Sequence, residues 1–561
     1  MPQGQTGARL LVETLRANGV DRAFCVPGES YLAVLDAMVD APEIDLVICR
    51  QEGGAAIMAE ADGQMTGRPG ICFVTRGPGA TNASAGVHIA FQDSTPMILF
   101  IGQVARHQVE REAFQEIDYR RMFGEMAKWV AQIEDPARVP EYVSHAFHTA
   151  MSGRPGPVVL ALPEDMLTEE VLEQAAIPGP AHVVQSHPGP EAMAELRAMM
   201  ETAERPLMIL GGGSWTEQAS QDIRAFAEAN NIPTSVSFRR QDLLPNDHPL
   251  YAGDVGIGIN PKLAERVRTS DLILAVGPRL GEMTTGGYSL FDIPVPKQRL
   301  VHIHPGAEEL GRVYRPAMAI NSGMPGFAAA AKAMQPVTGR WDNWAGTAHD
   351  DYLAWTEPAK TPGDVQMGEI VAWLRDQLPA DAMICNGAGN YTAWVHRYYR
   401  YRGYATQLAP TSGSMGYGVP AAVAAKLRHP ERNVVCFAGD GCFLMTGQEL
   451  ATAKQYGANV IFIVVNNGTY GTIRMHQERE YPGRVSGTDL INPDFAALAK
   501  AYGATGEIVT ETAQFADAFA RAQAADSPAL IELRTDPEAI SPSATLSGLR
   551  SQAEARDAGK A

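Results

Sequence analysis

The sequence has no strongly basic run and no long apolar run. Of its 561 residues, 46 are Lys or Arg and 64 are Asp or Glu, which gives a formal net charge of −18. Because phosphate backbones and anionic membrane surfaces bind clustered positive charge, this balance argues against both as partners. A helix that spans a bilayer needs about 20 consecutive apolar residues, and apolar runs such as residues 460–465 are much shorter. We therefore expect no nucleic acid and no membrane among the partners.

Cysteine is scarce, and its spacing disfavours the common metal and disulfide patterns. None of the six cysteines forms a CxxC pair, and five lie in short apolar runs: Cys25, Cys49, Cys72, Cys385 and Cys436. A free cysteine in such a run behaves as a small core hydrophobe. We predict buried free thiols rather than disulfides or a cysteine metal site.

The first residues do not have the pattern of a secretory signal. Residues 6–19 place Arg and Glu between apolar positions and end in Gly19. Charges interrupt the apolar stretch that a signal peptide needs, and glycine commonly ends a helix. We predict an amphipathic helix here and a cytoplasmic location.

Alternating strand and helix patterns predict an α/β fold. Between residues 44 and 105, short apolar runs alternate with helical patterns around a glycine-rich turn at 77–82, and similar alternation returns twice further on. This order is typical of a doubly wound parallel sheet. We predict three such domains, at residues 1–176, 190–338 and 365–545. A linker containing Pro and Gly lies near residues 177–190, and a weakly patterned polar stretch occupies residues 339–364.

Polar residues follow two apolar strands of the third domain. The strand at residues 433–438 runs into Asp440, and a second strand ends at Asn467, 27 residues after that aspartate. If the strands are neighbours, both side chains emerge at the sheet edge where open α/β folds bind ligands. An aspartate oxygen, an asparagine oxygen and a backbone carbonyl from Thr469 suit Mg²⁺, which prefers hard oxygen ligands beside phosphates. Glycines 439 and 441 allow backbone N–H groups to approach a diphosphate.

Together these features resemble the diphosphate-binding signature of thiamine diphosphate enzymes, and the resemblance covers nearly the whole chain. It is strongest to the acetolactate synthase (acetohydroxyacid synthase) large subunit family. The motifs that carry it are RQEGGAA at 50–56, AEADGQMTGRPG at 59–70, TRGPGATN at 75–82, AFQEID at 113–118, GSMGYGVPAA at 413–422, and GDG with NNGTYG at 439–441 and 466–471. NNGTYG is also similar to the form found in benzoylformate decarboxylase.

The resemblance implies a role for each domain and a homodimer, or a homotetramer, with active sites at the interface. The first domain would bind the aminopyrimidine, with Glu52 against its N1′ atom to activate the cofactor by acid–base chemistry. The third would bind the diphosphate and Mg²⁺, with Gly413 and Met415 beside the aminopyrimidine. The implied cofactor residues are Gly28, Asn390, Tyr391, Gly413, Met415, Gly439, Asp440, Gly441, Cys442, Asn467, Thr469, Tyr470, Gly471 and Thr472.

The sequence departs from the family where the substrate binds. Glu29 stands at a family glycine position; it is either an acid that assists protonation, as in 2-oxo acid decarboxylases, or a solvated loop carboxylate. Phe114 and Gln115 match residues that line the carboligase pocket. His476 replaces a family tryptophan that helps to select the second substrate, and Lys128 matches a lysine near the approach to the site.

The resemblance leaves a flavin open. Glycines 211–213 and Arg279 are similar to a flavin-binding region of the family, but the FDDR portion is missing. The glycines either bind FAD or form a tight turn, so FAD is uncertain.

The implied function is a carboligase that decarboxylates a 2-oxo acid such as pyruvate and joins the C2-bound carbanion to a second carbonyl compound, an aldehyde or another 2-oxo acid. The alternatives are a 2-oxo acid decarboxylase or aldehyde lyase that does not ligate, a flavin-coupled oxidase, and a non-catalytic cofactor-binding paralogue.

Overall fold

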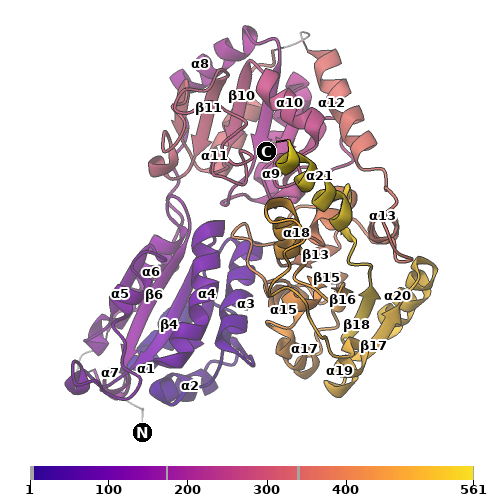
Figure 1. Cartoon of the computed structure of the whole chain (residues 1–561). Helices are drawn as coiled ribbons and strands as arrows, with labels where there is room; N and C mark the ends of the chain where they lie inside the picture. The colour runs from indigo at the N-terminus through magenta and orange to yellow at the C-terminus, as the bar shows by residue number, and fades with distance from the viewer. Residues whose placement is uncertain (1–4, 172–174, 338–340, 560–561) are drawn as a thin grey trace. The chain divides into compact units, whose positions relative to one another are not determined.

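The computed structural model describes residues 5–171, 175–337 and 341–559, which form three parallel sheets of six strands each. The chain divides into two compact units, residues 1–185 and residues 186–561 (Figure 1). The first unit contains one sheet and the second contains two. The prediction of an α/β fold with three doubly wound parallel sheets is confirmed. No helix in the described ranges is both long and apolar enough for a transmembrane span.

The first sheet has the strand order β2-β1-β3-β4-β6-β5. Its strands are β1 (Arg22–Cys25), β2 (Asp45–Ile48), β3 (Gly70–Val74), β4 (Met97–Gln103), β5 (Trp129–Gln132) and β6 (Pro157–Pro163). The accompanying helices are α1 (Gly7–Ala17), α2 (Leu32–Val39), α3 (Glu52–Thr66), α4 (Pro78–Asp93), α5 (Tyr119–Phe123), α6 (Val139–Met151) and α7 (Glu164–Thr168). Every residue of β4 and β6 is buried, because helices cover both faces of a parallel sheet. Helices α3 and α4 pack against each other.

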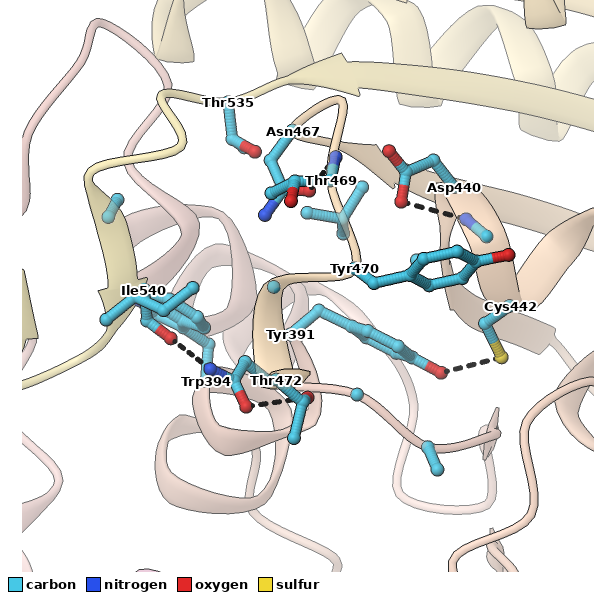
Figure 2. Close-up of a pocket in the computed structure, with 18 of the residues that line it drawn as sticks. Tyr391, Trp394, Asp440, Cys442, Asn467, Thr469, Tyr470, Thr472, Thr535 and Ile540 are labelled. Atoms are coloured by element: carbon cyan, nitrogen blue, oxygen red, sulfur yellow. Dashed lines mark hydrogen bonds between the residues drawn. The ribbon is translucent and has the colours of Figure 1, made fainter. Parts of the chain in front are cut away.

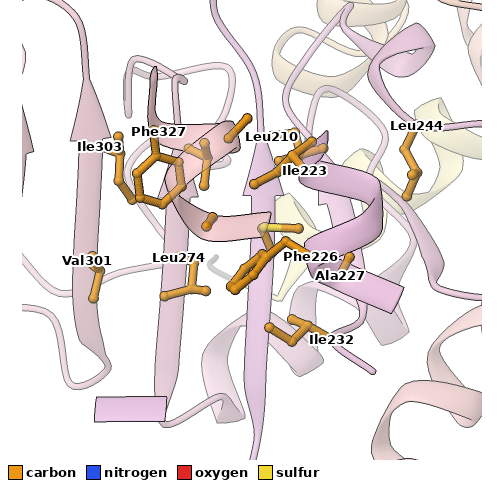
Figure 3. Close-up of a cluster of buried hydrophobic side chains, with 14 of the residues drawn as sticks. Leu210, Ile223, Phe226, Ala227, Ile232, Leu244, Leu274, Val301, Ile303 and Phe327 are labelled. Atoms are coloured by element: carbon orange, nitrogen blue, oxygen red, sulfur yellow. The ribbon is translucent and has the colours of Figure 1, made fainter. Parts of the chain in front are cut away.

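The central sheet has the order β12-β11-β10-β7-β8-β9. Its strands are β7 (Pro206–Leu210), β8 (Thr234–Val236), β9 (Tyr251–Asp254), β10 (Leu272–Val276), β11 (Arg299–His304) and β12 (Met318–Asn321). Its helices are α8 (Pro190–Glu201), α9 (Glu217–Asn230), α10 (Pro261–Thr269), α11 (Met324–Ala333) and α12 (Asp342–Trp355). Phe226 of α9 and Phe327 of α11 pack with Leu274 and Ile303 of the strands in one buried apolar cluster (Figure 3).

The C-terminal sheet has the order β14-β13-β15-β16-β18-β17. Its strands are β13 (Met383–Asn386), β14 (Gln407–Leu408), β15 (Val434–Gly439), β16 (Ile461–Asn466), β17 (Thr505–Val509) and β18 (Ala529–Arg534), and a hairpin of β19 (Ala539–Ser541) and β20 (Ala544–Thr545) follows. The helices are α13 (Met367–Gln377), α14 (Thr392–Tyr398), α15 (Gly418–Arg428), α16 (Asp440–Phe443), α17 (Leu450–Gln455), α18 (Gly471–Glu480), α19 (Phe495–Ala501), α20 (Phe515–Ala524) and α21 (Leu546–Ala558). Helix α21 packs on α18.

Local signals explain several of these boundaries. The Oγ1 atom of Thr6 accepts a hydrogen bond from the N–H of Arg9 and caps α1. The predicted stop at Gly19 follows directly after α1, with φ at +70°, a conformation that glycine adopts easily. The cysteine prediction is also confirmed, because all six cysteines are free and buried.

The sequence pattern misses six strands and one helix. Strands β1, β5, β9, β12, β14 and β17 are not predicted, because most of them have four residues or fewer, or lie at a sheet edge. Residues 446–457, whose pattern predicts one helix, form a short 3-10 turn (Gly447–Glu449) followed by α17. The polar stretch at 339–364 contains α12, whose Tyr352 packs edge-on against Tyr251 of β9.

Candidate functional site

A pocket lies at the carboxyl edge of the C-terminal sheet. The chain runs from β13 to β14 on one side of that sheet and places β15, β16, β18 and β17 on the other. Such a reversal leaves a crevice at the carboxyl ends of the strands, where open α/β folds bind ligands. Residues that follow β13, β15 and β16 line a pocket of about 280 Å³ at this position.

The pocket gathers all of the cofactor residues predicted in this unit (Figure 2). They are Asn390, Tyr391, Gly413, Met415, Gly439, Asp440, Gly441, Cys442, Asn467, Thr469, Tyr470, Gly471 and Thr472. Sequence reasoning misses further lining residues, among them Thr361, Val365, Met367, Trp394, Thr535 and Ile540. These residues lie outside the motifs, and only the folding of the chain brings them to the pocket.

Asp440 and Asn467 follow neighbouring strands, as predicted. Strands β15 and β16 pair in parallel, with Gly439 opposite Val465. The Asp440 carboxylate is 4% exposed and accepts hydrogen bonds from the N–H of Gly441 at 2.8 Å and the N–H of Gly468 at 2.9 Å. Burial raises the pKa of Asp440 above its ordinary value. A cation would offset this cost, because an opposite charge favours the ionised carboxylate.

Asn492 connects Asp440 to the end of β16. Its Nδ2 atom donates to Oδ2 of Asp440 at 2.8 Å and to Oδ1 of Asn466 at 2.9 Å. The Nδ2 atom of Asn466 in turn donates to the buried Glu532 at 2.8 Å. The aspartate is therefore oriented by a chain of amide side chains.

The ligand set suits a hard cation that shares its coordination with phosphate. The described parts of the chain contain no group of three His, Cys, Asp or Glu residues that could hold a metal ion by themselves. One carboxylate from Asp440, the amide oxygen of Asn467 and the carbonyl of Thr469 would leave further positions for diphosphate oxygens. The residues therefore fit Mg²⁺ with a diphosphate.

Aromatic rings lie directly over the glycines of the pocket. A Cβ atom at Gly439 would lie 3.1 Å from the ring of Tyr391, and one at Gly441 would lie 2.5 Å from the ring of Tyr470. The hydroxyl of Tyr391 lies 3.5 Å from Sγ of Cys442 (Figure 2), and burial raises the pKa of Tyr391. A side chain at either glycine would displace a pocket wall.

The opposite end of the pocket is fixed by Asn390. Its Oδ1 atom accepts from the hydroxyl of Thr472 at 2.8 Å, and its Nδ2 atom donates to the carbonyl of Ile540 at 2.9 Å (Figure 2). Thr472 lies in the first turn of α18, where backbone N–H groups and the helix dipole favour an anion. This end has the chemistry for binding a phosphate.

Gly413 and Met415 lie in the turn that precedes α15. Gly413 is exposed and has φ at +67°, and an added Cβ would meet nothing within 4 Å. The half-buried Met415 packs against the C-terminal core cluster. The N–H of Gly416 donates to Sγ of Cys442 at 3.2 Å, which ties this turn to the residues after β15.

In the N-terminal unit, Glu52 begins α3 beside the carboxyl end of β2. The Asn82 amide donates to Oε2 of Glu52 at 2.9 Å. A Cβ at Gly79 would lie 3.4 Å from Oε1. The carboxylate is thus held between the starts of α3 and α4.

The other predicted residues of this unit gather at the same carboxyl edge. Gly28 fits closely, since an added Cβ would lie 2.4 Å from Cβ of Thr75. Glu29 is exposed and lies 3.5 Å from Nη2 of Arg76. The Phe114 side chain is 71% exposed, and Gln115 adopts φ of +66° against Gly77.

Two predicted residues lie elsewhere. His476 is exposed on α18 and does not line the pocket. Lys128 lies at the amino end of β5, where its ammonium group donates to the carbonyl of Ser152 at 2.6 Å. The site residues lie at carboxyl ends, so Lys128 does not join them.

Packing explains the glycines of the central domain without a flavin. A Cβ at Gly212 would lie 1.9 Å from the carbonyl oxygen of Gly277, and one at Gly211 would lie 2.1 Å from Oγ of Ser237. Arg279 lies 3.6 Å from the buried carboxylate of Glu309. The turn therefore needs glycines for close backbone approach.

Three family models match the chain, each within one predicted domain. They are the N-terminal TPP binding domain of thiamine pyrophosphate enzymes at residues 5–122, the central domain at residues 193–330 and the C-terminal TPP binding domain at residues 387–533.

Curated relatives match over nearly the full length. The acetolactate synthase large subunit of Parasynechococcus marenigrum (strain WH8102) is 32% identical, over 95% of this chain and 88% of that protein. The acetolactate synthase large subunit of Corynebacterium glutamicum is 31% identical over 95% and 87%. The acetolactate synthase isozyme 2 large subunit of Escherichia coli (strain K12) is 30% identical over 94% and 95%.

Proposed function

Because the chain belongs to the acetolactate synthase family of thiamine pyrophosphate enzymes, we propose that it decarboxylates a 2-oxo acid such as pyruvate and joins the remaining acyl fragment to a second carbonyl group. The observation that carries this proposal is the pocket at the switch point of the C-terminal sheet, where the residues after β15 and β16 converge. Bound thiamine diphosphate supplies the carbon nucleophile that takes up and releases the acyl fragment.

The chain's own residues have separate tasks in this proposal. Asp440, Asn467 and Thr469 hold Mg²⁺, and Asn390 and Thr472 orient the terminal phosphate. Glu52 would exchange a proton with the aminopyrimidine, and Asn82 orients Glu52 through Oε2. Gly413 and Met415 fix the aminopyrimidine.

We propose a homodimer with the active site at its interface, as the family resemblance implies. In the N-terminal unit Leu32, Val39 and Phe114 are exposed, and in the second unit Ile473, Tyr481 and Ile491 are exposed. Contact with a partner subunit would bury side chains of this kind. Light scattering of the purified protein distinguishes a dimer from a tetramer. The six free, buried cysteines suit the reducing cytoplasm.

A 2-oxo acid decarboxylase without ligation is the second candidate, and Glu29 is the observation that favours it. An acid beside the acyl fragment could donate the proton that releases an aldehyde. Replacing Glu29 by Gln should then slow aldehyde release and leave cofactor binding unchanged. An unchanged rate of aldehyde release in this variant excludes that role.

The test of the main proposal is a panel of 2-oxo acids and aldehydes with thiamine diphosphate and Mg²⁺, analysed by mass spectrometry. We expect carbon dioxide together with a hydroxyketone or an acetohydroxy acid. If every donor gives only the free aldehyde, the carboligase proposal is wrong. If no donor releases carbon dioxide, both candidates are wrong.

A further inference from the structure

Arg76 links three strand ends of the first sheet with one side chain. It follows β3 and is 8% exposed. Its Nη2 lies 3.5 Å from Oε1 of Glu29, after β1, and its Nη1 lies 3.1 Å from Oε2 of Glu164, after β6. Its Nε atom donates to the carbonyl of Phe114, in the loop after β4, at 3.1 Å. All three nitrogen atoms of the guanidinium are therefore engaged.

This arrangement requires the geometry of arginine. A guanidinium presents donors in several fixed directions in one plane, whereas a lysine ammonium is a point charge on a flexible stem. Glu29 and Phe114 belong to different segments of the chain, and the sequence predicts that both lie where the substrate binds. Arg76 is the group that sets the position of one relative to the other.

The rest of the loop that carries Phe114 is fixed without Arg76. The Glu116 carboxylate accepts from the N–H of Glu110 at 2.7 Å and from the N–H of Ala113 at 3.0 Å. On its other side, Nε2 of Gln103 donates to the carbonyl of Ile117 at 3.0 Å. Loss of Arg76 should therefore free the backbone of Phe114 and Gln115 and leave the ends of the loop in place.

We propose that Arg76 is a positioning residue that determines whether the acyl fragment is ligated or released. After carbon dioxide leaves, the fragment bonds either to a proton, which gives an aldehyde, or to the carbonyl carbon of an acceptor, whose oxygen then takes the proton and gives a hydroxyketone. Ligation needs an acceptor held in a narrow range of positions, whereas a proton can come from water or a flexible acid. Because Arg76 holds Glu29 and Phe114 in fixed positions relative to each other, it favours ligation over release of the aldehyde. This inference rests on the proposed carboligase function.

The test compares Arg76→Met with Arg76→Lys and a matched control, Arg106→Met. Arg106 also bridges strand ends, through Asp165 at 2.8 Å and Glu169, but its hydrogen bonds go to Asp165, Glu134 and Glu169 and not to Glu29 or Phe114. For each variant, with pyruvate as donor and acetaldehyde as acceptor, we would measure carbon dioxide release, the hydroxyketone formed, the net change in acetaldehyde, the melting temperature and the Kd of thiamine diphosphate with Mg²⁺.

We expect the ratio of hydroxyketone to released aldehyde to fall at least about fivefold in Arg76→Met, because small displacements of acceptor-binding groups have large effects on rate. Arg76→Lys should give an intermediate ratio, and Arg106→Met should keep the wild-type ratio. Cofactor Kd should change by less than about twofold, since the contacts of Arg76 are with Glu29, Glu164 and Phe114, which are not among the proposed cofactor-binding residues.

An unchanged ratio in Arg76→Met, or an equal fall in Arg106→Met, would overturn the inference. If Arg76→Met does not fold, Arg76→Lys is compared with the wild type instead, and an unchanged ratio of hydroxyketone to released aldehyde in Arg76→Lys overturns the inference. If the wild-type protein releases carbon dioxide but forms no hydroxyketone, the carboligase function is wrong, and the inference fails with it. If the wild-type protein ligates and the Arg76 variants ligate equally well, only the inference about Arg76 is wrong.

Discussion

The amide of Asn82 donates a hydrogen bond to Oε2 of Glu52 over 2.9 Å. Glu52 is the first residue of α3, and Asn82 lies in the second turn of α4. The two helices pack against each other, so the orientation of the carboxylate is set by their contact. One carboxylate oxygen accepts this bond, and the proton exchange proposed for Glu52 would use the other.

Replacement of Glu52 by Gln should lower the rate by about 10²- to 10⁴-fold, the usual contribution of a general acid–base group. The amide has nearly the same shape, so the Kd of thiamine diphosphate should change little. Steady-state kinetics and fluorescence titration of the cofactor measure the two effects. Glu141→Gln, an exposed position on α6, is the control. Near-normal turnover in Glu52→Gln would contradict the assigned role.

Replacement of Asn492 by Ala should weaken Mg²⁺ binding about 10- to 100-fold, because groups that orient a metal ligand have effects of this size. The change removes the bonds to Asp440 and Asn466 and leaves the proposed ligands present. Calorimetric titration of Mg²⁺ with thiamine diphosphate present measures the affinity. Asn459→Ala serves as the control, since Asn459 contacts the exposed Asp526 instead. Equal affinity in both variants would show that Asn492 does not support the metal site.

The contact between α18 and α21 should weaken in acid. Hydrogen bonds from Arg550 to Glu478 at 2.6 and 2.8 Å lower the pKa of Glu478 to about 2, from an ordinary value of 4.5. A lowered pKa stabilises the folded protein above pH 4.5, and this stability is lost as the pH falls from 4.5 towards 2. The full contribution is at most about 3 kcal/mol.

Hydrogen exchange of residues 546–558 tests this contact. We expect faster exchange of this segment at pH 3 than at pH 6 after correction for the intrinsic rate, and faster exchange at pH 6 in Arg550→Met. Arg556→Met is the control for the ion pair, because Arg556 lies further along the same helix and donates to the carbonyl of Arg479 on α18 at 2.9 Å but does not reach Glu478. If residues 546–558 exchange at the same rate in Arg550→Met and Arg556→Met, the ion pair between Arg550 and Glu478 is not the cause of their protection.

Phe226 should be a large source of stability in the central domain. Its side chain is fully buried among Leu274, Ile303 and Phe327 (Figure 3). Phe226→Ala should lower the free energy of unfolding by about 3–5 kcal/mol. Denaturant unfolding followed by tryptophan fluorescence measures it, because Trp215 and Trp341 belong to the same cluster. Ile257→Ala, at an exposed side chain, should have little effect, and equal effects would contradict this account.

Much of the fold could be predicted from the sequence because the signals are local. Long buried strands such as β4, β6 and β16 are continuous apolar runs, and such runs are a direct result of burial on both faces of a sheet. Short strands at sheet edges lack this pattern and were missed. Helix α12 was missed for a related reason, since its apolar stripe is narrow and its stability comes from packing on β9.

By itself, the sequence determined the three-domain α/β architecture, the free cysteines, and the motif residues that meet at the pocket of the C-terminal sheet. Motif residues directly after adjacent parallel strands must meet at one edge, so their position in the chain fixes their position in the fold. Only the tertiary structure decided the contacts of Asn492 with Asp440 and of Arg76 with Glu164. These pairs are separated by 52 and 88 residues. The local sequence around a polar side chain does not determine which distant residue becomes its partner, because the packing of the strands brings the two together.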